Sequence, residues 1–412
     1  MTIKQVMLII TALVVTTQSY TMSINNRYIP WYTQPFGRTL EKRSHLQAEL
    51  FFMTGDKAFH HSSDESKGIP EVWGKYDQRT ASDVLIAMGI TSPLFAQWQI
   101  QKTIPWDVDQ KIESQGMSFK SEWAVGHGIS FGGSCAFMRI NCNQTFSIPF
   151  DTRKDMNLTP NQENELDRQR RAMNELIGIS STQWSETGFS DTQIYVRWGN
   201  VWDYKLKSRQ VDAGVKVGFY IPSGKERDIN NPASIPFGSD GMKGFFLGGD
   251  IALEIKEDWT AGMAIQLSSH FTKTKKHRLP VKKENYLFGG TTGNAEIDPG
   301  VTFVWNPFFR LGDLQDGLGV HVGYTLAHHA GDVWTDKRTD KTIAIDLNDM
   351  KDLSKWDAEY LSIYLSYDPS KVTIKDKIQP ILTINWDAPV KVFVAEDVAK
   401  THKIALGVAF NF

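Results

Sequence analysis

Cysteine, long apolar runs and an excess of positive charge are all scarce in this sequence. Two cysteines in 412 residues exclude a disulfide scaffold and a four-cysteine metal site. Cys135 and Cys142 fall on one expected strand, seven residues apart, so they face opposite sides about 23 Å apart and cannot bridge each other. A net charge of −2, with a pI near 6.6, argues against a nucleic-acid partner.

The shortage of apolar runs excludes a helical membrane protein. Past residue 15 no stretch approaches the roughly 18 uninterrupted apolar residues that a spanning helix needs, and the mean hydropathy is −0.33. The 41% hydrophobic and 22% charged residues also exclude a disordered chain. Length alone suggests two or three domains, but the strand pattern described below overrules that estimate.

The first 22 residues have the layout of an export signal. Lys4 supplies a positive charge, Val6 to Val15 form an apolar run, and a polar stretch follows at Thr16 to Ser23. The run is too short to span a bilayer. We therefore predict a cleaved signal peptide over residues 1–22 and a mature chain that works outside the cytoplasm. A buried N-terminal strand is the alternative.

From residue 45 to the end, apolar residues alternate with small or polar ones. In His402 to Phe412 the even-numbered positions from Ile404 onward are apolar, and the odd-numbered positions carry mostly small or polar residues. A strand facing water would normally carry large charged residues on that second face. The same pattern predicts twelve strands in all. They span about 45–54, 116–126, 128–145, 188–201, 209–221, 244–256, 259–272, 297–310, 317–330, 357–368, 378–387 and 402–412.

Short and long connections alternate between these strands. Gly126-His127-Gly128 and Lys256-Glu257-Asp258 are short links, whereas about 146–187, 222–243, 273–296 and 331–356 are long and polar. This layout predicts an all-β fold: a transmembrane, antiparallel, up-and-down β-barrel over residues 45–412, with short periplasmic turns and long extracellular loops. Fourteen strands are the alternative, because the span 55–115 has no clean strand pair and its Ser82 to Met88 fits a helix or a strand.

The residues on the two faces of the expected strands predict that the sheet closes into a barrel. A soluble sandwich would bury one face of each sheet and show large polar residues on the other. Here the second face is mostly Gly, Ala, Ser and Thr with isolated charges, which suits the interior of a barrel. In lipid every backbone N–H and C=O must pair internally, so an open sheet edge is not tolerated. A soluble sandwich or propeller is the competing interpretation.

The last strand resembles the assembly signature of Gram-negative outer-membrane β-barrel proteins. In that family a C-terminal aromatic residue ends the strand, with apolar residues at alternate positions before it. The matching residues are Ile404, Leu406, Val408, Phe410 and Phe412. The resemblance implies recognition by the barrel-assembly machinery and insertion into the lipid of the outer membrane. In size and long loops the chain also resembles the long-chain fatty-acid transporter family, which has fourteen strands and an N-terminal plug. Residues 23–44 are a periplasmic segment that could be such a plug.

Aromatic residues cluster near both ends of the expected strands, as interfacial girdles would. The expected girdle at the short-turn end is Trp198, Trp202, Trp259, Trp305, Phe308, Phe309 and Tyr367, and that at the long-loop end is Phe271, Tyr286, Trp334 and Trp386.

Strand parity also predicts which side chains line the lumen. They are Glu49, Lys120, Glu122, Arg197, Asp212, Lys216, Asp250, Glu254, Gln266, His270 and His321. Charges of both signs predict a channel of weak ion selectivity, through which small solutes diffuse passively. Three alternatives stay open: a lumen filled by paired side chains, a transporter of hydrophobic compounds with an N-terminal or loop plug, and a structural or adhesion barrel whose loops do the work.

Other motifs are weak. Thr159 to Ile177 predicts a helix within a long loop, either on the surface or folded into the mouth as a constriction. His60 and His61 open a polar loop that has metal-ligating residue types, but a solvated loop is the commoner case. Hydrolase, metalloprotease and phosphate-loop motifs are absent. We therefore predict no enzyme activity, cofactor or metal.

Overall fold

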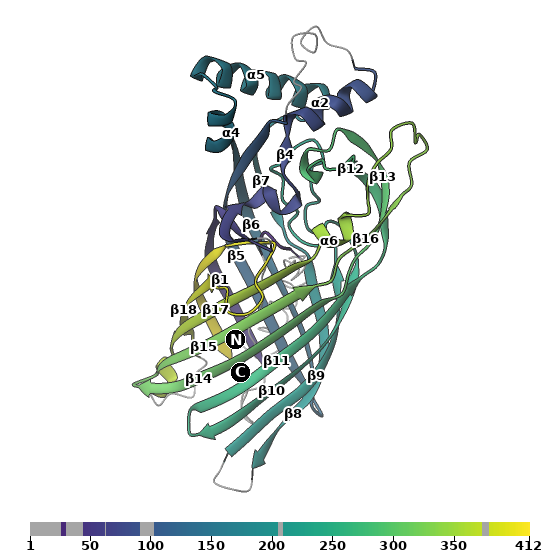
Figure 1. Ribbon diagram of the computed structural model, residues 1–412. Helices are drawn as coiled ribbons and strands as arrows, with labels where there is room; N and C mark the ends of the chain where they lie inside the picture. Colours follow the sequence, from purple (N-terminus) through teal and green to yellow (C-terminus); the bar gives the residue numbers. More distant parts are fainter. Residues whose placement is uncertain (1–25, 30–43, 62, 91–102, 205–208, 373–378) are drawn as a thin grey trace.

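The computed structural model describes residues 26–29, 44–61, 63–90, 103–204, 209–372 and 379–412, and these contain a closed antiparallel barrel of twelve strands (Figure 1). The strands are β1 (His45–Gly55), β5 (Pro105–Gly126), β6 (Ile129–Ser147), β8 (Thr192–Tyr204), β9 (Arg209–Ile221), β10 (Gly244–Lys256), β11 (Trp259–His270), β14 (Thr302–Gln315), β15 (Leu318–His329), β17 (Trp356–Tyr367), β18 (Ile381–Pro389) and β20 (His402–Asn411). Each pairs with the ring strand before and after it along the chain, so the fold is up-and-down.

The ring closes where the first strand meets the last. β1 pairs with β20 over ten residue pairs, from His45 opposite Asn411 to Thr54 opposite His402. In this register Leu50 faces Leu406 and Leu46 faces Phe410, so the apolar rows of both strands lie on the same side. Phe412 continues the seam, because its ring lies 5.0 Å from that of Trp123. The seam thus leaves neither terminal strand with an open edge.

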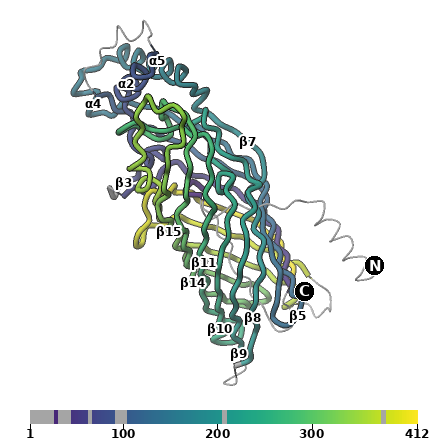
Figure 2. Tube along the Cα trace, turned by 90° about the vertical axis from the view of Figure 1, so that its right-hand side faces the viewer, coloured from purple at the N-terminus to yellow at the C-terminus, as the bar shows by residue number. Residues whose placement is uncertain are grey.

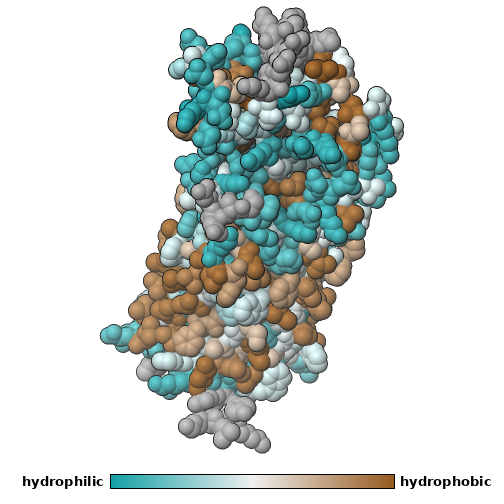
Figure 3. Space-filling model, viewed as in Figure 1, coloured by the Kyte–Doolittle hydropathy of each residue, from teal (hydrophilic) through white to brown (hydrophobic). Residues whose placement is uncertain are grey.

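Alternation turns apolar side chains outward around the whole ring. Leu50, Val217, Phe219, Ile265 and Leu406 are each about half exposed, whereas their chain neighbours are buried or half-buried. Figure 3 shows apolar residues gathered in a belt over the lower part of the barrel, with hydrophilic residues above it. An exposed apolar band on a closed barrel is the surface that a lipid bilayer covers.

Tight hairpins join the strands at one end. His127-Gly128 and Asp316-Gly317 each have two consecutive residues with positive φ, at 53° and 77° and at 48° and 84°. Two such residues form a type I′ turn, whose twist matches that of the flanking strands. Gly, Asp and His tolerate this backbone region better than most residues. The short links predicted from the sequence are therefore confirmed at this end of the barrel.

The opposite end carries a large polar cap. Figures 1 and 2 show that β5 and β6 extend beyond the ring toward α2, α4 and α5. The cap elements are β2 (Lys57–His60), β3 (Ser63–Gly68), η1 (Ile69–Trp73), β4 (Tyr76–Asp77), α2 (Gln78–Ala87), α4 (Phe150–Asp155), α5 (Pro160–Leu176), β7 (Gln183–Phe189), β12 (Lys273–Leu279), η2 (Tyr286–Phe288), β13 (Thr291–Asp298), β16 (Val333–Asp336), α6 (Met350–Leu353) and β19 (Val398–Ala399). A further short helix, η3 (Pro369–Lys371), lies at the short-turn end instead. A cluster of buried residues, including Phe51, Trp106, Met138 and Phe288, holds the cap to the barrel.

Several strand predictions need correction. β5 begins at Pro105 instead of residue 116, because it continues above the ring to pair with β4. Residues 297–301 do not belong to β14, since Ile297 and Asp298 end β13 in a separate three-stranded sheet. The sheet that contains the ring has fourteen strands. β4 pairs only with β5, and β7 pairs only with β6, so neither belongs to the ring, which has twelve strands.

The helix predictions resolve clearly. Ser82 to Ala87 is helical, within α2, and Met88 is its C-cap; the Asp77 carboxylate caps the N-terminus of the helix. Thr159 caps α5 through the reciprocal Thr159–Gln162 capping box. Met173 of α5 is buried, while Leu176 is exposed. Because Figure 1 shows α5 at the far tip of the cap, the helix covers the cap surface and is not a constriction in the mouth.

The girdle prediction is partly wrong. Trp198, Trp202 and Trp259 are exposed near the short turns, as expected. Phe308 is buried because it points inward, and Tyr286 is buried in the core of the cap. Trp334 packs against the cap core. Four other members of the predicted girdles are exposed, and Trp305 is half-buried; the four are Phe309, Tyr367, Phe271 and Trp386.

Two further expectations concern the chain outside the barrel and its thiols. The predicted signal peptide, residues 1–22, lies outside the described residues. Cys135 and Cys142 are both buried and form no disulfide with each other, as strand parity predicted. None of the helices in the described part of the chain is long and apolar enough to cross a membrane.

The apolar belt makes a prediction about stability. Val217 lies on β9 between Val196 of β8 and Leu247 of β10, and its side chain is half exposed. Val217→Arg would place a charge in lipid, which costs about 2–4 kcal/mol near the bilayer midplane. Urea unfolding from lipid vesicles should show this loss.

The matched control is Val333→Arg on β16, where the valine is equally exposed but lies outside the ring. We expect a change within about 0.5 kcal/mol there. Equal losses for both variants would mean that β9 does not face lipid.

Candidate functional site in the barrel lumen

The predicted lumen residues all lie on the inward faces of their strands. Along their strands they alternate with residues that are exposed or half-buried and mostly apolar. Glu49, Glu122, Arg197, Asp212, Gln266, His270 and His321 are buried, and Lys120, Lys216, Asp250 and Glu254 are half-buried. Parity therefore placed these side chains on one surface, but it could not tell which of them meet.

Arg197 is the centre of a charge network on β8, β9 and β10. Its Nη2 lies 2.8 Å from Asp212 Oδ1 and 2.6 Å from Asp250 Oδ2, and its Nε donates to Asp250 Oδ1 at 3.0 Å. The guanidinium is 3% exposed. A buried cation of this kind is tolerated because two carboxylates compensate the loss of water.

Two glycines leave room for this guanidinium. A Cβ on Gly214 would come 2.5 Å from Arg197 Cζ, and one on Gly199 would come 2.7 Å from Arg197 Nη1. Gly199 and Gly214 face each other on adjacent strands, so the side chain lies flat against bare backbone. These two glycines of the inner face are therefore needed to make room for the Arg197 side chain.

A second charged group lies across the ring on β18, β20 and β1. Lys403 Nζ is 2.8 Å from Asp387 Oδ2, and both side chains are largely buried. Glu49 accepts from Gln47 at 2.7 Å and from Ser118 at 3.3 Å. Lys403 and Asp387 were not among the predicted lumen residues. Their strand parity would have identified them, since Lys403 alternates with Ile404 and Leu406.

Glu122 lies between the two groups. It accepts hydrogen bonds from Tyr195 Oη at 2.9 Å and from Ser130 Oγ at 2.6 Å. Lys216 Nζ lies 5.8 Å from the centre of the Tyr195 ring, within cation–π range. The charged side chains of the lower lumen are thus held in place by hydrogen bonds and ring contacts.

Aromatic and histidine rings fill the middle of the lumen. Tyr220 contacts Phe246 at 5.1 Å and stacks on His270 at 5.2 Å, and its hydroxyl accepts from Gln266 at 2.8 Å. On the other side His321 stacks on Phe308 at 5.3 Å. These side chains are all less than 9% exposed. Among the described residues, the side chains in the middle of the lumen are therefore packed against one another.

Residues Asn26 to Ile29 are buried at the long-loop end of the lumen. The Arg27 guanidinium donates to the carbonyls of Leu353 and Lys355 at 2.8 and 3.0 Å and lies 4.2 Å from the Trp73 ring. The Tyr28 carbonyl accepts from Thr401 Oγ1 at 2.7 Å. This part of the predicted segment 23–44 therefore contacts both the cap and the strand that closes the ring.

A cavity of about 130 Å³ adjoins Arg27. Its wall combines aromatic rings with titratable side chains. The lining includes Trp73, Tyr286, Trp334, Trp356, Arg227, His270, His277, His329, Asp240 and Asp332. Three buried atoms of lining residues have no hydrogen-bond partner within the described residues: Arg27 Nη1, His277 Nε2 and Trp334 Nε1. Burial also lowers the pKa of His277 to about 4, so this ring is neutral at pH 7.

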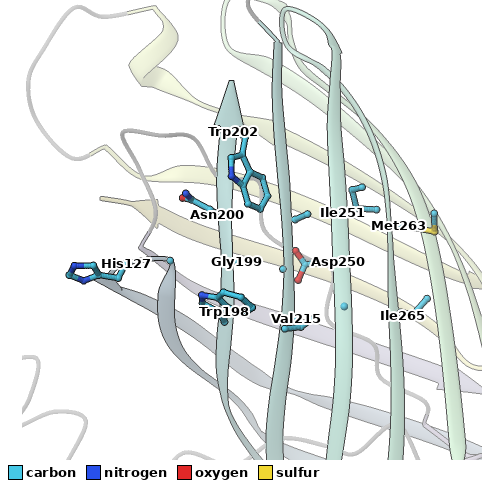
Figure 4. Close-up of a pocket in the computed structure, with 14 residues that line it drawn as sticks. His127, Trp198, Gly199, Asn200, Trp202, Val215, Asp250, Ile251, Met263 and Ile265 are labelled. Atoms are coloured by element: carbon cyan, nitrogen blue, oxygen red, sulfur yellow. The ribbon is translucent and has the colours of Figure 1, made fainter. Parts of the chain in front are cut away.

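A larger hollow than this cavity lies on the outer wall. A groove of about 620 Å³ crosses β8 to β11 near the His127-Gly128 turn. Figure 4 shows Trp198 and Trp202 on one strand at its border, with Met263 and Ile265 on the far side. The floor of the groove is formed in part by two small residues, Ala213 and Gly249. The groove belongs to the apolar belt and not to a path through the barrel.

Solved barrel structures are similar in fold. No known protein family matches the sequence, and a comparison with characterised proteins gives no match. An outer membrane channel from Pseudomonas putida F1 is similar over 92% of this chain and 100% of its own, at 7% identity and a TM-score of 0.47. The NanC porin is similar over 73% and 94%, at 11% identity and a TM-score of 0.31. A FadL homologue from Pseudomonas aeruginosa is similar over 90% and 91%, at 8% identity and a TM-score of 0.30.

The glycine cradle around Arg197 predicts a sharp positional effect. Gly214→Ala would drive a methyl group into the guanidinium and displace it from Asp212 and Asp250. Overpacking of this kind costs about 1–3 kcal/mol, measurable by urea unfolding in lipid vesicles.

Gly249→Ala is the matched control, because its new Cβ would meet nothing closer than 3.6 Å. We expect it to be neutral within about 0.5 kcal/mol. Equal effects of the two substitutions would contradict the packing described for Arg197.

The buried His277 predicts an acid-sensitive cap. Its pKa in the folded chain, about 4, is below the unfolded value of 6.5, so stability from the neutral ring is present above pH 6.5 and is lost as the pH falls toward 4. Burial is the main cause, Lys275 and Arg227 add to it, and Asp240 and Glu226 oppose it. Between pH 7 and pH 5 the wild type should lose about 1–2 kcal/mol more than His277→Gln.

Urea unfolding at both pH values makes the comparison. The other histidines are common to both proteins, so their titration cancels in the difference. Identical losses would show that His277 takes up its proton in the folded cap.

Proposed function

We propose that this chain is an outer-membrane channel for the passive diffusion of small solutes. The observation that carries the proposal is the division of the barrel wall: apolar side chains cover its outer surface, and charged and polar ones cover its inner surface. A polar lumen inside an apolar shell offers hydrated solutes a route of lower free energy through the bilayer. On this proposal the short turns are periplasmic and the long loops extracellular.

The packed middle of the lumen supports a narrow and gated pathway. Rings at mid-barrel and residues 26–29 at the long-loop end occupy the space through which a solute would pass. Twelve strands lie between eight-stranded barrels filled by side chains and sixteen-stranded open porins. Conduction therefore requires side chains or residues 26–29 to move, and the described state is a closed one.

The charges of the lumen support weak ion selectivity. The predicted lumen set holds three cationic residues, Lys120, Arg197 and Lys216, against five carboxylates. Arg197 is neutralised locally by Asp212 and Asp250, and Lys403, which is outside the set, by Asp387. Because neighbouring opposite charges cancel at a distance, the field along the lumen is small. We propose a slight preference for cations.

The cavity beside Arg27 favours a second candidate, transport of compact apolar or aromatic compounds. Trp73, Tyr286, Trp334 and Trp356 supply flat apolar walls, and a volume of 130 Å³ suits a molecule the size of a single ring. The unpaired nitrogen atoms of Arg27, His277 and Trp334 would favour a ring that carries hydrogen-bond acceptors. Among similar structures, a TodX mutant and CymD are described as monoaromatic hydrocarbon channels.

Partners and export also belong to this proposal. The last strand presents Ile404, Leu406, Val408, Phe410 and Phe412 on its outward face, and we propose that the barrel-assembly machinery reads them. The cleaved signal peptide over residues 1–22 supplies the export step. No nucleic acid partner and no catalytic activity are proposed.

Planar-bilayer recording of the mature chain tests the channel. Arg27→Ala removes the hydrogen bonds to Leu353 and Lys355 and the contact with Trp73. A hydrogen bond to a charged group is worth about 1.5–3 kcal/mol, so the open fraction should rise roughly tenfold or more. Stepwise conductance that increases in this variant is the expected result.

Arg168→Ala is the control, because Arg168 is exposed on α5 and pairs with Glu165 at the surface. It should leave conductance unchanged. Silence of the wild type and of Arg27→Ala, together with cell binding that depends on the long loops, would instead support the adhesion alternative. Uptake of a monoaromatic compound without ion conductance would favour the second candidate.

A further inference from the structure

Two histidines and an aspartate that are far apart in the sequence meet beside the barrel seam. One possible ligand atom each from His60, His61 and Asp397 lies within 4.8 Å of the others. His61 Nδ1 is 3.0 Å from Asp397 Oδ2, and the rings of His60 and His61 stack at 4.5 Å. The cluster lies outside the lumen site and outside the proposed pathway.

Backbone pairing builds this juxtaposition. β2 follows β1, and β19 precedes β20. Val398 and Ala399 of β19 pair with Phe59 and Ala58 of β2. The Asp397 carboxylate also accepts from the His61 backbone N–H at 3.4 Å. Two short strands therefore hold the ends of the two chain segments that flank the seam.

Burial and exposure suit a bound cation. His60 and Asp397 are buried, whereas the His61 side chain is 55% exposed and leaves the cluster open to solvent.

Negative charge surrounds the cluster. Glu396 adjoins Asp397, and its backbone bridges to Asp357, whose carboxylate lies 2.7 Å from His328 Nδ1. A divalent cation bound at Asp397 would offset the negative charge of these carboxylates.

We propose that His60, His61 and Asp397 bind one divalent transition-metal ion of the zinc type. Two imidazoles and one carboxylate are a ligand set that Zn²⁺ accepts, with water completing the tetrahedron. Ligands at about 2.0–2.2 Å from zinc lie roughly 3.3 Å apart, so small side-chain rotations bring the three atoms into one coordination sphere. Hard ions such as Ca²⁺ prefer all-oxygen sites and are excluded.

At this position a bound ion would stabilise the barrel seam. It joins the segment after the first strand of the ring to the segment before the last strand. A link across the β1–β20 seam opposes separation of these strands, which is the step that opens a barrel into a sheet with two edges. Zinc should therefore raise the temperature at which the barrel unfolds.

Zinc titration of the tag-free mature chain, folded in detergent, tests the site by calorimetry. We expect one Zn²⁺ per chain and no competition by Ca²⁺. His61→Ala and Asp397→Asn should each weaken zinc binding roughly tenfold or more. Asn suits position 397 because the native φ is 50°, a region that Asn tolerates.

His127→Asn is the matched control, since His127 is an exposed histidine of similar φ at the opposite end of the barrel. It should bind zinc as the wild type does. Gel mobility before and after boiling confirms that each variant is folded, and zinc should raise the temperature of the mobility shift in the wild type and in His127→Asn alone. Absence of one-to-one zinc binding, or unchanged affinity in His61→Ala and Asp397→Asn, would overturn the proposal.

Discussion

Backbone hydrogen bonding in a medium without water governs this structure. A strand in lipid cannot leave its N–H and C=O groups unpaired, so the sheet must close on itself. The β1–β20 pairing meets that demand with ten residue pairs in a register that keeps both apolar rows outside. The type I′ turns at His127-Gly128 and Asp316-Gly317 serve the same end, because each reverses the chain within two residues between adjacent strands.

Closure also determines what the interior can hold. Polar side chains that are buried inside the ring lose contact with bulk water, so they must form hydrogen bonds or ion pairs with one another. Arg197 does so with two aspartates, and Lys403 with Asp387. The glycines beside Arg197 and the rings stacked on His270 and His321 then set the free width of the lumen. On the proposed function, conduction depends on how easily these side chains and residues 26–29 can move.

Local alternation predicted the strands well because one rule decides the position of every side chain on a strand. It failed where that rule ends. Ile297 alternates correctly but belongs to the cap sheet, and Phe308 looked like a girdle residue although it packs on His321. The meeting of His61 with Asp397, across 336 positions, depends on the pairing of β2 with β19. Such long-range contacts leave no periodic trace in a sequence.

Spin labels placed one at a time along β9 in lipid vesicles test the central claim most directly. Positions 215, 217 and 219 should be accessible to oxygen dissolved in the bilayer, and positions 214, 216 and 218 should be shielded from it. This period of two follows from a wall one strand thick, with lipid on one side and a polar interior on the other. Uniform accessibility along the strand, or access of a water-soluble relaxation agent to positions 215, 217 and 219, would contradict the account.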